Sequence, residues 1–294
     1  MDNQTEREWK GQSRGGKLGN AIFVRTIQLF GVKCAYVLLS LVVIYFIPFA
    51  PKATKAIWYY NRKRLGYGFF RSIAELYMHY FVFGQTLIDK IALKAGMQDK
   101  YNFHFDNYER FLEIINGDSG VVMIGAHVGN WEAGSVFFGD YGKKINVVMF
   151  DVERKEIREV LEKDANRGGY KIIPVNEGSI EALLKIKIAL NEGEYVCFNG
   201  DRFIDKETAV EREFMGGKAK FPIGPFRIAA KCRVPVVFYY SVREKDCTYR
   251  FMFTEVKDST KDYNVLLDTY VKSLEEVLKS YPRQWFNFYT FWND

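Results

Sequence analysis

Apolar residues form one long run near the N-terminus and many short runs in the rest of the chain. Residues 34–51 contain no charged side chain, and a helix of this length would roughly match the hydrocarbon thickness of a bilayer. Residues 53–96 have the spacing of one or two amphipathic helices with a broad aromatic stripe. The pattern predicts an N-terminal hydrophobic and amphipathic helical region, preceded by a polar, flexible or surface-lying lead-in over residues 1–20.

Short apolar strands alternate with charged helical patterns after residue 100. This alternation predicts an α/β fold with a mixed central sheet flanked by helices, because the last two strands are close enough to form a hairpin at the far side of the sheet. We divide the chain into residues 1–100 and an α/β catalytic domain, residues 101–294. The expected strands are 121–124, 145–150, 172–175, 195–198, 234–242 and 249–256, and the expected helices are 107–116 (capped by Asp106), 153–167, 179–190 and 261–280.

Three interpretations of residues 34–51 remain open. The first is a membrane anchor or re-entrant segment, the second is a buried core helix, and the third is a cleaved signal peptide, although no small-residue cleavage site stands out. Both flanks are basic, so the positive-inside rule gives no orientation, and the pattern fits a helix in one leaflet as well as a span. The aromatic stripe after it fits a core-facing helix and a surface that touches lipid or walls an acyl-chain groove equally, and His79 within it is expected to be a packed or interfacial residue.

Composition limits the possible partners and cofactors. The net charge of +6 favours acidic partners such as anionic lipid headgroups, acyl carrier protein or phosphates, and no nucleic-acid partner is expected because the basic residues form no single block. The four cysteines form no CxxC pair and are expected to be reduced core residues, as on a cytoplasmic face. The three histidines show no metal-ligand spacing, so no metal is expected.

The stretch from Gly120 to Asp140 predicts a strand, a tight turn and a helix. His127 follows the strand, and Asn130 is placed to cap a helix that begins at Trp131. Glu132 lies in the first turn of that helix, where a strand-to-helix corner brings it within reach of His127. A carboxylate on one imidazole nitrogen fixes the tautomer and leaves the other nitrogen as a general base. No Ser or Cys nucleophile accompanies the pair, so it suits a substrate that supplies its own hydroxyl or amine.

A second polar group follows the strand 195–198. Asp201 and Arg202 either bind a phosphate or the thioester region of a donor, or tether their loop. The next residues, 203–214, read as a charged loop of the kind that covers sites. Lys218 and Arg227 flank a Gly-rich turn and the start of a helix, where they either hold an anionic group or are solvated. The turn matches neither a P-loop nor a Rossmann fingerprint.

His127-Val-Gly-Asn-Trp-Glu132 resembles the H-x4-D/E motif of the lysophospholipid acyltransferase superfamily, and the surrounding blocks resemble its lipid A biosynthesis (late acyltransferase) branch. Ala126 stands where glycerol-phosphate acyltransferases usually have Asn. The resemblance covers roughly residues 15–292. The further blocks are Asn199-Gly-Asp-Arg202, Phe214-Met-Gly-Gly217, Pro222-Ile-Gly-Pro-Phe-Arg-Ile-Ala-Ala230 and Tyr281-Pro-Arg-Gln-Trp-Phe-Asn-Phe288.

The resemblance implies a membrane-associated acyltransferase at the inner (cytoplasmic) membrane, with its catalytic domain facing the cytoplasm. A fatty acyl group would pass from an acyl carrier protein or coenzyme A thioester to a hydroxyl or amine of a lipid acceptor such as a lipid A precursor. Its implied residues are catalytic His127 and Glu132, with Asn130, Asp201, Arg202, Lys218 and Arg227 for substrate.

Neither a metal nor a redox cofactor is implied. An amino-acid lipid, a glycolipid and a polyene pigment are alternative acceptors, and a thioester hydrolase and a non-catalytic lipid-binding protein are alternative classes. The aromatic terminus, 285–292, either packs back onto the cleft or contacts acyl chains or the membrane interface.

Overall fold

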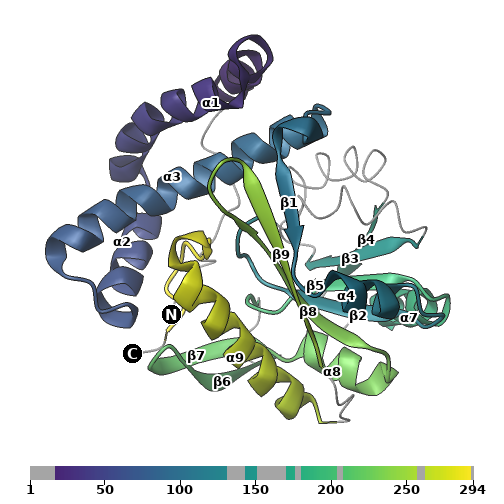
Figure 1. Ribbon diagram of the computed structural model, residues 1–294. Helices are drawn as coiled ribbons and strands as arrows, with labels where there is room; N and C mark the ends of the chain where they lie inside the picture. The colour runs from purple at the N-terminus through teal and green to yellow at the C-terminus, as the bar shows by residue number, and fades with distance from the viewer. Residues whose placement is uncertain are drawn as a thin grey trace, which may run out of the picture.

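The computed structural model describes residues 17–130, 143–150, 170–175, 180–203, 208–256 and 262–292. Within these residues, a seven-stranded sheet in the order β1-β9-β8-β2-β5-β3-β4 forms the centre of the molecule (Figure 1). A separate two-stranded sheet pairs β6 with β7. The strands are β1 Asn102–Phe105, β2 Val121–Gly125, β3 Ile145–Phe150, β4 Tyr170–Val175, β5 Tyr195–Asn199, β6 Ala209–Phe214, β7 Gly217–Pro222, β8 Val236–Arg243 and β9 Thr248–Glu255.

The central sheet is mixed, as predicted. β2 runs parallel to β5 and β8, while β8 and β9 form the antiparallel hairpin that the sequence suggested. The hairpin lies towards one side of the sheet, as predicted, but it is not the edge, because β1 pairs in parallel with β9 beyond it. β1 has only four residues, and its short alternating pattern led to no strand prediction.

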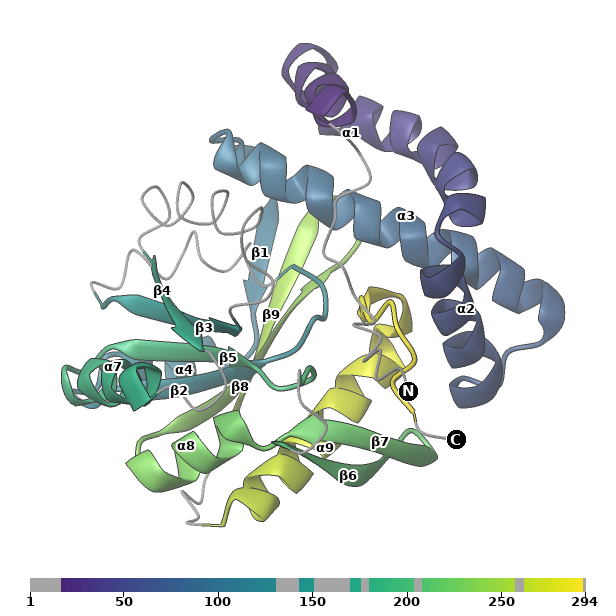
Figure 2. The same ribbon diagram turned by 180° about the vertical axis from the view of Figure 1, so that it is seen from behind.

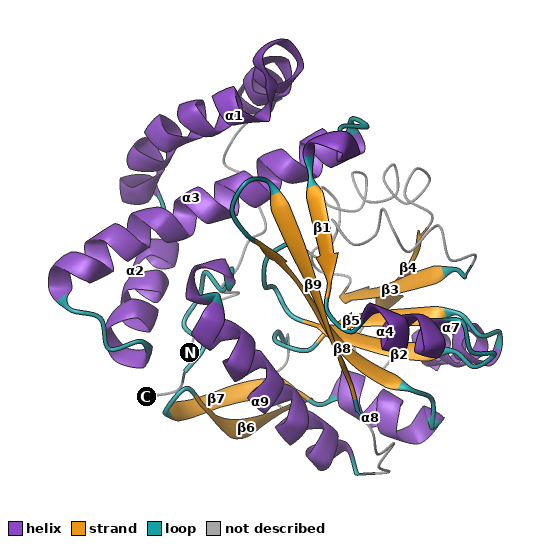
Figure 3. Ribbon diagram, in the orientation of Figure 1, coloured by secondary structure: helices purple, strands orange, loops and turns teal. Residues whose placement is uncertain are grey.

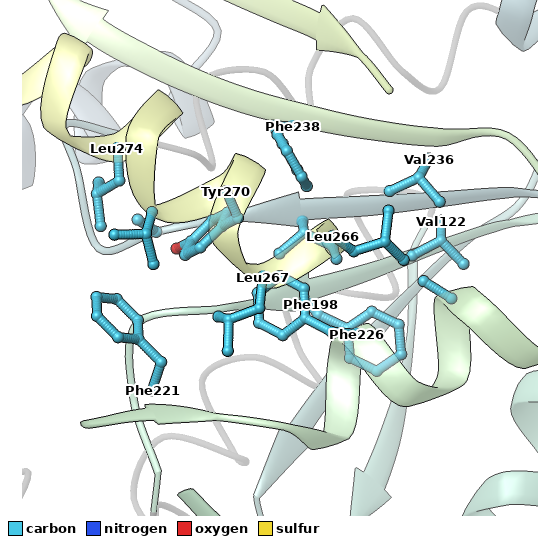
Figure 4. Close-up of a cluster of buried hydrophobic side chains, with 14 of the residues drawn as sticks. Val122, Phe198, Phe221, Phe226, Val236, Phe238, Leu266, Leu267, Tyr270 and Leu274 are labelled. Atoms are coloured by element: carbon cyan, nitrogen blue, oxygen red, sulfur yellow. The ribbon is translucent and has the colours of Figure 1, made fainter. Parts of the chain in front are cut away.

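Helices cover both faces of the central sheet (Figures 2 and 3). Side chains alternate between the faces along each strand, so Val121 and Met123 of β2 join a hydrophobic cluster with α3 and α4, whereas Val122 and Ile124 join one with α7, α8 and α9. Figure 4 shows the second cluster, in which Phe238 and Tyr270 contribute from β8 and α9. These helices are α3 Phe69–Lys94, α4 Tyr108–Ile115, α7 Ile180–Asn191, α8 Gly224–Cys232 and α9 Tyr263–Ser280.

The apolar N-terminal run lies in α1, Lys17–Phe49, which is longer than the sequence predicted and kinks at Gly31, where φ is 81°. One stripe of α1 packs on α3 so closely that a Cβ on Gly84 would lie 2.4 Å from Leu39 Cδ1. The stretch Ala21–Phe49 is long and apolar enough to cross a membrane, and only 22% of its most apolar window is buried. Such limited burial does not fit a core helix.

The amphipathic stretch after α1 forms two helices, as one of the predicted options allowed. α2 covers Pro51–Tyr59 and continues as a π-helix over Tyr60–Arg64 before α3 begins at Phe69. α3 ends at Lys94, two residues before Gly96, where the backbone turns with φ of 83°. Residues on both sides of position 100 share one hydrophobic cluster; the division into 1–100 and 101–294 stays a prediction.

Two local predictions are wrong. Asp106 does not cap α4: Asn107 is at the N-cap position without a side-chain hydrogen bond, and Asp106 instead accepts from Arg250 Nη1 at 3.0 Å. The charged segment 203–214 is not a loop throughout, because residues 209–214 form β6 and pair with β7. The alternating side chains of this hairpin place Phe214 and Phe221 in the core, so burial rather than overall charge decided its structure.

The cysteines are free, as predicted, but not all of them are core residues. Cys197 and Cys247 are buried, Cys232 is intermediate, and Cys34 on α1 is exposed. The helices predicted to begin at Trp131 and to cover 153–167 lie outside the described residues.

Candidate active site

Two parallel strands bring His127 and Asp201 together. β2 ends at Gly125 and β5 at Asn199, and these two residues are paired across the sheet. The residues that follow therefore meet at the carboxyl-terminal ends of the strands, where active sites in open α/β sheets lie. His127 Nδ1 is 2.8 Å from Asp201 Oδ1, and the backbone N–H of His127 donates to Asp201 Oδ2 at 2.9 Å. The expected proximity of the two strand ends is thus present.

The Asp201 carboxyl group is almost fully buried, with 1% of its side chain exposed. Burial raises its pKa, but the protonated His127 ring, the hydrogen bonds from His127 and the charge of Arg202 lower it to about 2. Asp201 is therefore a carboxylate at neutral pH. Because a carboxylate only accepts hydrogen bonds, it holds the neutral His127 ring in the Nδ1–H tautomer and leaves Nε2 as the basic nitrogen. The His127 side chain is 22% exposed, so the ring is not sealed within the core.

Gly129 allows the turn after His127 to pass close to β8. Its φ is 62°, and a Cβ at this position would lie 2.0 Å from the backbone oxygen of Ser241. Only glycine meets both conditions without strain. The N–H of Gly129 donates to Gln284 O at 2.8 Å, and the N–H of Asn130 donates to Ser241 O at 2.8 Å. The turn is therefore fixed from both sides.

The C-terminal segment packs back onto this turn, which was one of the two predicted alternatives. Phe286 N–H donates to His127 O at 2.8 Å, and the indole of Trp285 donates to Asp201 Oδ2 at 3.1 Å. Arg283 fixes the start of the segment by two hydrogen bonds to Glu75 of α3, at 2.5 and 2.8 Å. The last residues of the chain thus form a wall of the His127–Asp201 site.

The sequence that forms this arrangement also matches a known protein family. The family model of the bacterial lipid A biosynthesis acyltransferases matches residues 77–294. The chain belongs to this family. No curated protein matches the chain significantly. The family resemblance that we inferred from the motifs is therefore confirmed, and the chain is an acyltransferase that acts on lipid substrates.

The matched residues include the sheet, His127, Asp201 and the C-terminal segment, whereas α1, α2 and the start of α3 precede them. The candidate site therefore lies in the part of the chain that matches the family. Glu132, the predicted partner of His127, lies outside the described residues. Asp201 makes a contact with one imidazole nitrogen of the kind that we predicted for Glu132, and the role of Glu132 stays a prediction.

Asn130 and Arg202, both expected to bind substrate, have contacts inside the acyltransferase. Asn130 is buried, and its Nδ2 donates to the backbone oxygen of Thr86 on α3 at 3.4 Å. Arg202 Nη2 donates to the backbone oxygen of Phe286 at 3.1 Å and so holds the C-terminal segment. Of the two, Arg202 acts on the His127–Asp201 pair, because its positive charge lowers the pKa of the Asp201 carboxyl group.

Lys218 and Arg227 lie on other elements. Lys218 is on β7, where its side chain is 76% exposed and pairs with Glu211 at 3.1 Å. Arg227 is on α8, and its guanidinium lies 4.9 Å from the centre of the Tyr263 ring. Within the described part of the chain, neither side chain has a hydrogen bond or ion pair with His127 or Asp201. Their proposed binding of an anionic substrate group has no support from these contacts.

A buried ion pair that sequence analysis missed supports the turn from the side of α3. Asp89 of α3 is fully buried and accepts from Arg243 Nε at 2.9 Å. It also accepts from the hydroxyls of Tyr101 at 2.9 Å and Tyr249 at 2.6 Å, and from that of Tyr36 on α1. The backbone of Arg243 is paired with the Gln284 side chain at 2.7 and 2.6 Å. Because Gln284 O accepts from Gly129, the cluster connects α1 and α3 to the turn.

Proposed function

We propose that this acyltransferase moves a fatty acyl group from an acyl thioester to a hydroxyl or amine of a lipid acceptor, with His127 as the general base. The observation that supports the proposal most directly is the 2.8 Å contact between His127 Nδ1 and the buried Asp201 carboxylate. It leaves Nε2 of a partly exposed imidazole available for the acceptor. Positioned bases of this kind typically contribute about 10²- to 10⁴-fold in rate.

The proposed reaction is a direct transfer. His127 Nε2 removes the proton from the acceptor hydroxyl or amine while the acceptor atom attacks the thioester carbonyl carbon. Collapse of the tetrahedral intermediate breaks the carbon–sulfur bond, and the imidazolium returns its proton to the leaving thiolate. Asp201 stabilises the imidazolium between these two steps, as a carboxylate partner does in other acyl-transfer sites. Because the acceptor is the nucleophile, the proposal includes no acyl-enzyme.

The sequence does not assign the donors to the oxyanion, and Arg202 and the backbone amides near Gly129 are the candidates that we consider. The amides of His127, Gly129 and Asn130 already donate to Asp201, Gln284 and Ser241, respectively. They are therefore not available to a tetrahedral intermediate in this conformation. Arg202 remains the proposed electrostatic contributor, because it lies next to Asp201 and carries a fixed positive charge.

The donor in this proposal is acyl carrier protein or coenzyme A carrying the acyl thioester, and the acceptor is a lipid A precursor. An amino-acid lipid, a glycolipid or a polyene pigment would present the same hydroxyl or amine. We place the acyltransferase at the inner (cytoplasmic) membrane with its site facing the cytoplasm. The apolar, exposed face of α1 supports membrane association, and Lys218 and Arg227 are proposed to meet anionic parts of donor or acceptor.

The proposal is tested by following a labelled acyl group from acyl carrier protein or coenzyme A into lipid. The assay compares the unchanged chain with His127→Ala and Asp201→Asn, and melting curves confirm that both variants fold. We expect labelled lipid from the unchanged chain and at least about 10²-fold slower transfer by either variant. Near-normal transfer by a folded His127→Ala variant would overturn the mechanism, and release of free fatty acid without labelled lipid would indicate hydrolysis.

A further inference from the structure

The positive charge of the chain is concentrated in its N-terminal quarter. From Trp9 to Ala74 the sequence contains eleven Lys or Arg residues and no Asp or Glu. The whole chain has 42 basic and 36 acidic residues, so the remainder has 31 basic and 36 acidic residues and a net charge of −5. A segment of this length without any acid is unusual for a solvated protein surface, where both signs are normally mixed.

Part of this segment forms a projecting corner between two helices. The α2–α3 corner, residues 52–73, comprises α2 after its first residue, the π-helix Tyr60–Arg64, a short loop and the start of α3. It lies with α1 on one flank of the molecule, away from the sheet, in both views (Figures 1 and 2). Single π-helical turns often occur at functional sites, and this one presents Arg62, Lys63 and Arg64 in succession.

Four exposed basic side chains of the corner have no acidic partner among the described residues. They are Lys52, Lys55, Arg62 and Lys63. Within the described part of the chain, the hydrogen bond of the Arg62 side chain goes to a backbone oxygen, that of Tyr67, at 2.6 Å. The neighbouring Arg71 differs, because its Nε lies 4.0 Å from Glu75 Oε1. Arg64 is less exposed, and its guanidinium lies over the Trp292 ring at 4.9 Å as well as donating to Gly216 O at 2.9 Å. The corner therefore carries positive charge that the folded chain does not neutralise.

The same corner also exposes large apolar side chains. Phe70 is 84% exposed, Phe69 is 56% exposed, and the ring centre of Trp58 lies 5.5 Å from that of Phe69. Aromatic side chains next to Lys and Arg are typical of membrane–water interfaces, where the rings lie at headgroup level. The exposed apolar face of α1 ends at Phe49, two residues before α2 begins, and α1 lies on the same flank of the molecule as this corner (Figures 1 and 2).

We propose that the α2–α3 corner binds the surface of a bilayer that contains anionic lipids. Phe69 and Phe70 enter the headgroup region, and Lys52, Lys55, Arg62 and Lys63 contact lipid phosphates. The exposed apolar surface of α1 favours a bilayer over a nucleic acid, because a polyanion in water leaves such a surface exposed. This binding is independent of the acyl transfer, and it gives the corner a preference for charged lipid that an apolar helix alone does not have.

The test measures flotation of the full-length chain with vesicles of phosphatidylcholine alone and with vesicles that also contain phosphatidylglycerol. The ratio of the two partition coefficients isolates the charge preference, because the apolar contribution of α1 is common to both. Each basic side chain near an anionic surface is worth about fivefold in binding. We therefore expect Arg62→Gln/Lys63→Gln to lower this ratio about 25-fold and Phe69→Ser/Phe70→Ser to weaken binding to both kinds of vesicle.

The chain offers matched controls on α7, which lies at the opposite end of the molecule in both views (Figures 1 and 2). Lys185→Gln/Lys187→Gln removes two exposed charges and Leu183→Ser/Leu184→Ser two exposed apolar side chains, and neither should change vesicle binding. All variants should keep acyl transfer in detergent, which reports folding separately from lipid binding. Equal binding to both vesicles, equal losses from the α7 and corner variants, or binding of heparin without any vesicle preference would overturn the proposal.

Discussion

The indole Nε1 of Trp285 donates a hydrogen bond to Asp201 Oδ2 at 3.1 Å, although the two residues are 84 positions apart. Asp201 also accepts from the backbone and ring of His127, so its carboxylate receives three hydrogen bonds in a buried position. Hydrogen bonds to a carboxylate favour its charged form. The C-terminal segment therefore helps to keep ionised the group that orients His127.

This contact predicts a specific effect of Trp285→Phe. The variant keeps an aromatic ring in a buried position but removes one of the two donors to Asp201 Oδ2 and leaves only the His127 N–H on that oxygen. A hydrogen bond to a charged group is typically worth about 1.5–3 kcal/mol. The Asp201 pKa should rise from its lowered value. We expect a lower kcat and an acid limb of the pH–rate profile that moves to higher pH, measured by initial acyl transfer at several pH values.

Trp292→Phe is the control for this change. Trp292 also donates from its indole, to Phe214 O at 2.9 Å, and is also buried, but it has no hydrogen bond to Asp201. Its variant should lose some stability without any movement of the acid limb. The same shift in both variants would show that Trp285 acts only through packing.

Gly129 gives a second prediction. Alanine at this position would have a positive φ and a Cβ 2.0 Å from Ser241 O, so the turn must move. We expect Gly129→Ala to lower the free energy of unfolding by more than about 1 kcal/mol and to reduce acyl transfer, because His127 is two residues away. Gly66→Ala is the control, since Gly66 has a φ of 66° and no atom lies within 4 Å of the position that its Cβ would take. Equal activity of the two variants would contradict the role of the close approach.

The pH dependence of stability should reveal His79. The ring is buried on α3, and burial lowers its pKa to about 4 despite a hydrogen bond with the Trp285 backbone and the charge of Glu75. The unfolded chain takes up this proton near pH 6.5, whereas the folded chain does not until about pH 4. The contribution of neutral His79 is therefore complete above pH 6.5 and falls as the pH is lowered towards 4, by about 3 kcal/mol in total.

Denaturant unfolding of the unchanged chain and of His79→Phe, measured from pH 7 to pH 4, tests this assignment. The phenylalanine ring suits the neighbouring rings of Phe286 and Phe288, whose centres lie 6.0 Å from that of His79. The difference in unfolding free energy between the two proteins should change in favour of the variant as the pH falls. A constant difference would mean that His79 does not titrate in this range.

The Asp89–Arg243 pair leads to a prediction about folding. Removing one partner from a buried pair leaves an uncompensated charge and typically costs about 3–5 kcal/mol. We expect Arg243→Met to lose stability in this range and Asp89→Asn/Arg243→Met to lose less, because the double variant leaves no buried charge. Thermal and denaturant unfolding provide the measurement. A double variant that loses as much stability as Arg243→Met, or more, would contradict coupling between the two residues.

The sequence predicted the parallel strand ends that bring His127 and Asp201 to one edge, because each polar group follows a short apolar run. It did not predict that Asp201 contacts His127 Nδ1. The H-x4-E spacing offered Glu132 as a nearer partner, and a contact across 74 residues depends on the register of β2 and β5. The bonds from Trp285 and Arg283 were missed for the same reason, since each joins residues that only the complete fold brings together.

The orientation of His127 allows a final prediction, in which Asp201 and Glu132 are compared directly. If Asp201 fixes the tautomer, Asp201→Asn accepts either tautomer and should slow acyl transfer by about 10²- to 10⁴-fold in a folded protein. With His127→Ala, the aspartate has nothing left to orient, so His127→Ala/Asp201→Asn should be about as slow as His127→Ala alone. Glu132→Gln and His127→Ala/Glu132→Gln show in the same way whether Glu132 acts together with His127. Initial rates and melting curves for these five variants decide the question: multiplicative losses for Asp201 and coupled losses for Glu132 would transfer the orienting role to Glu132.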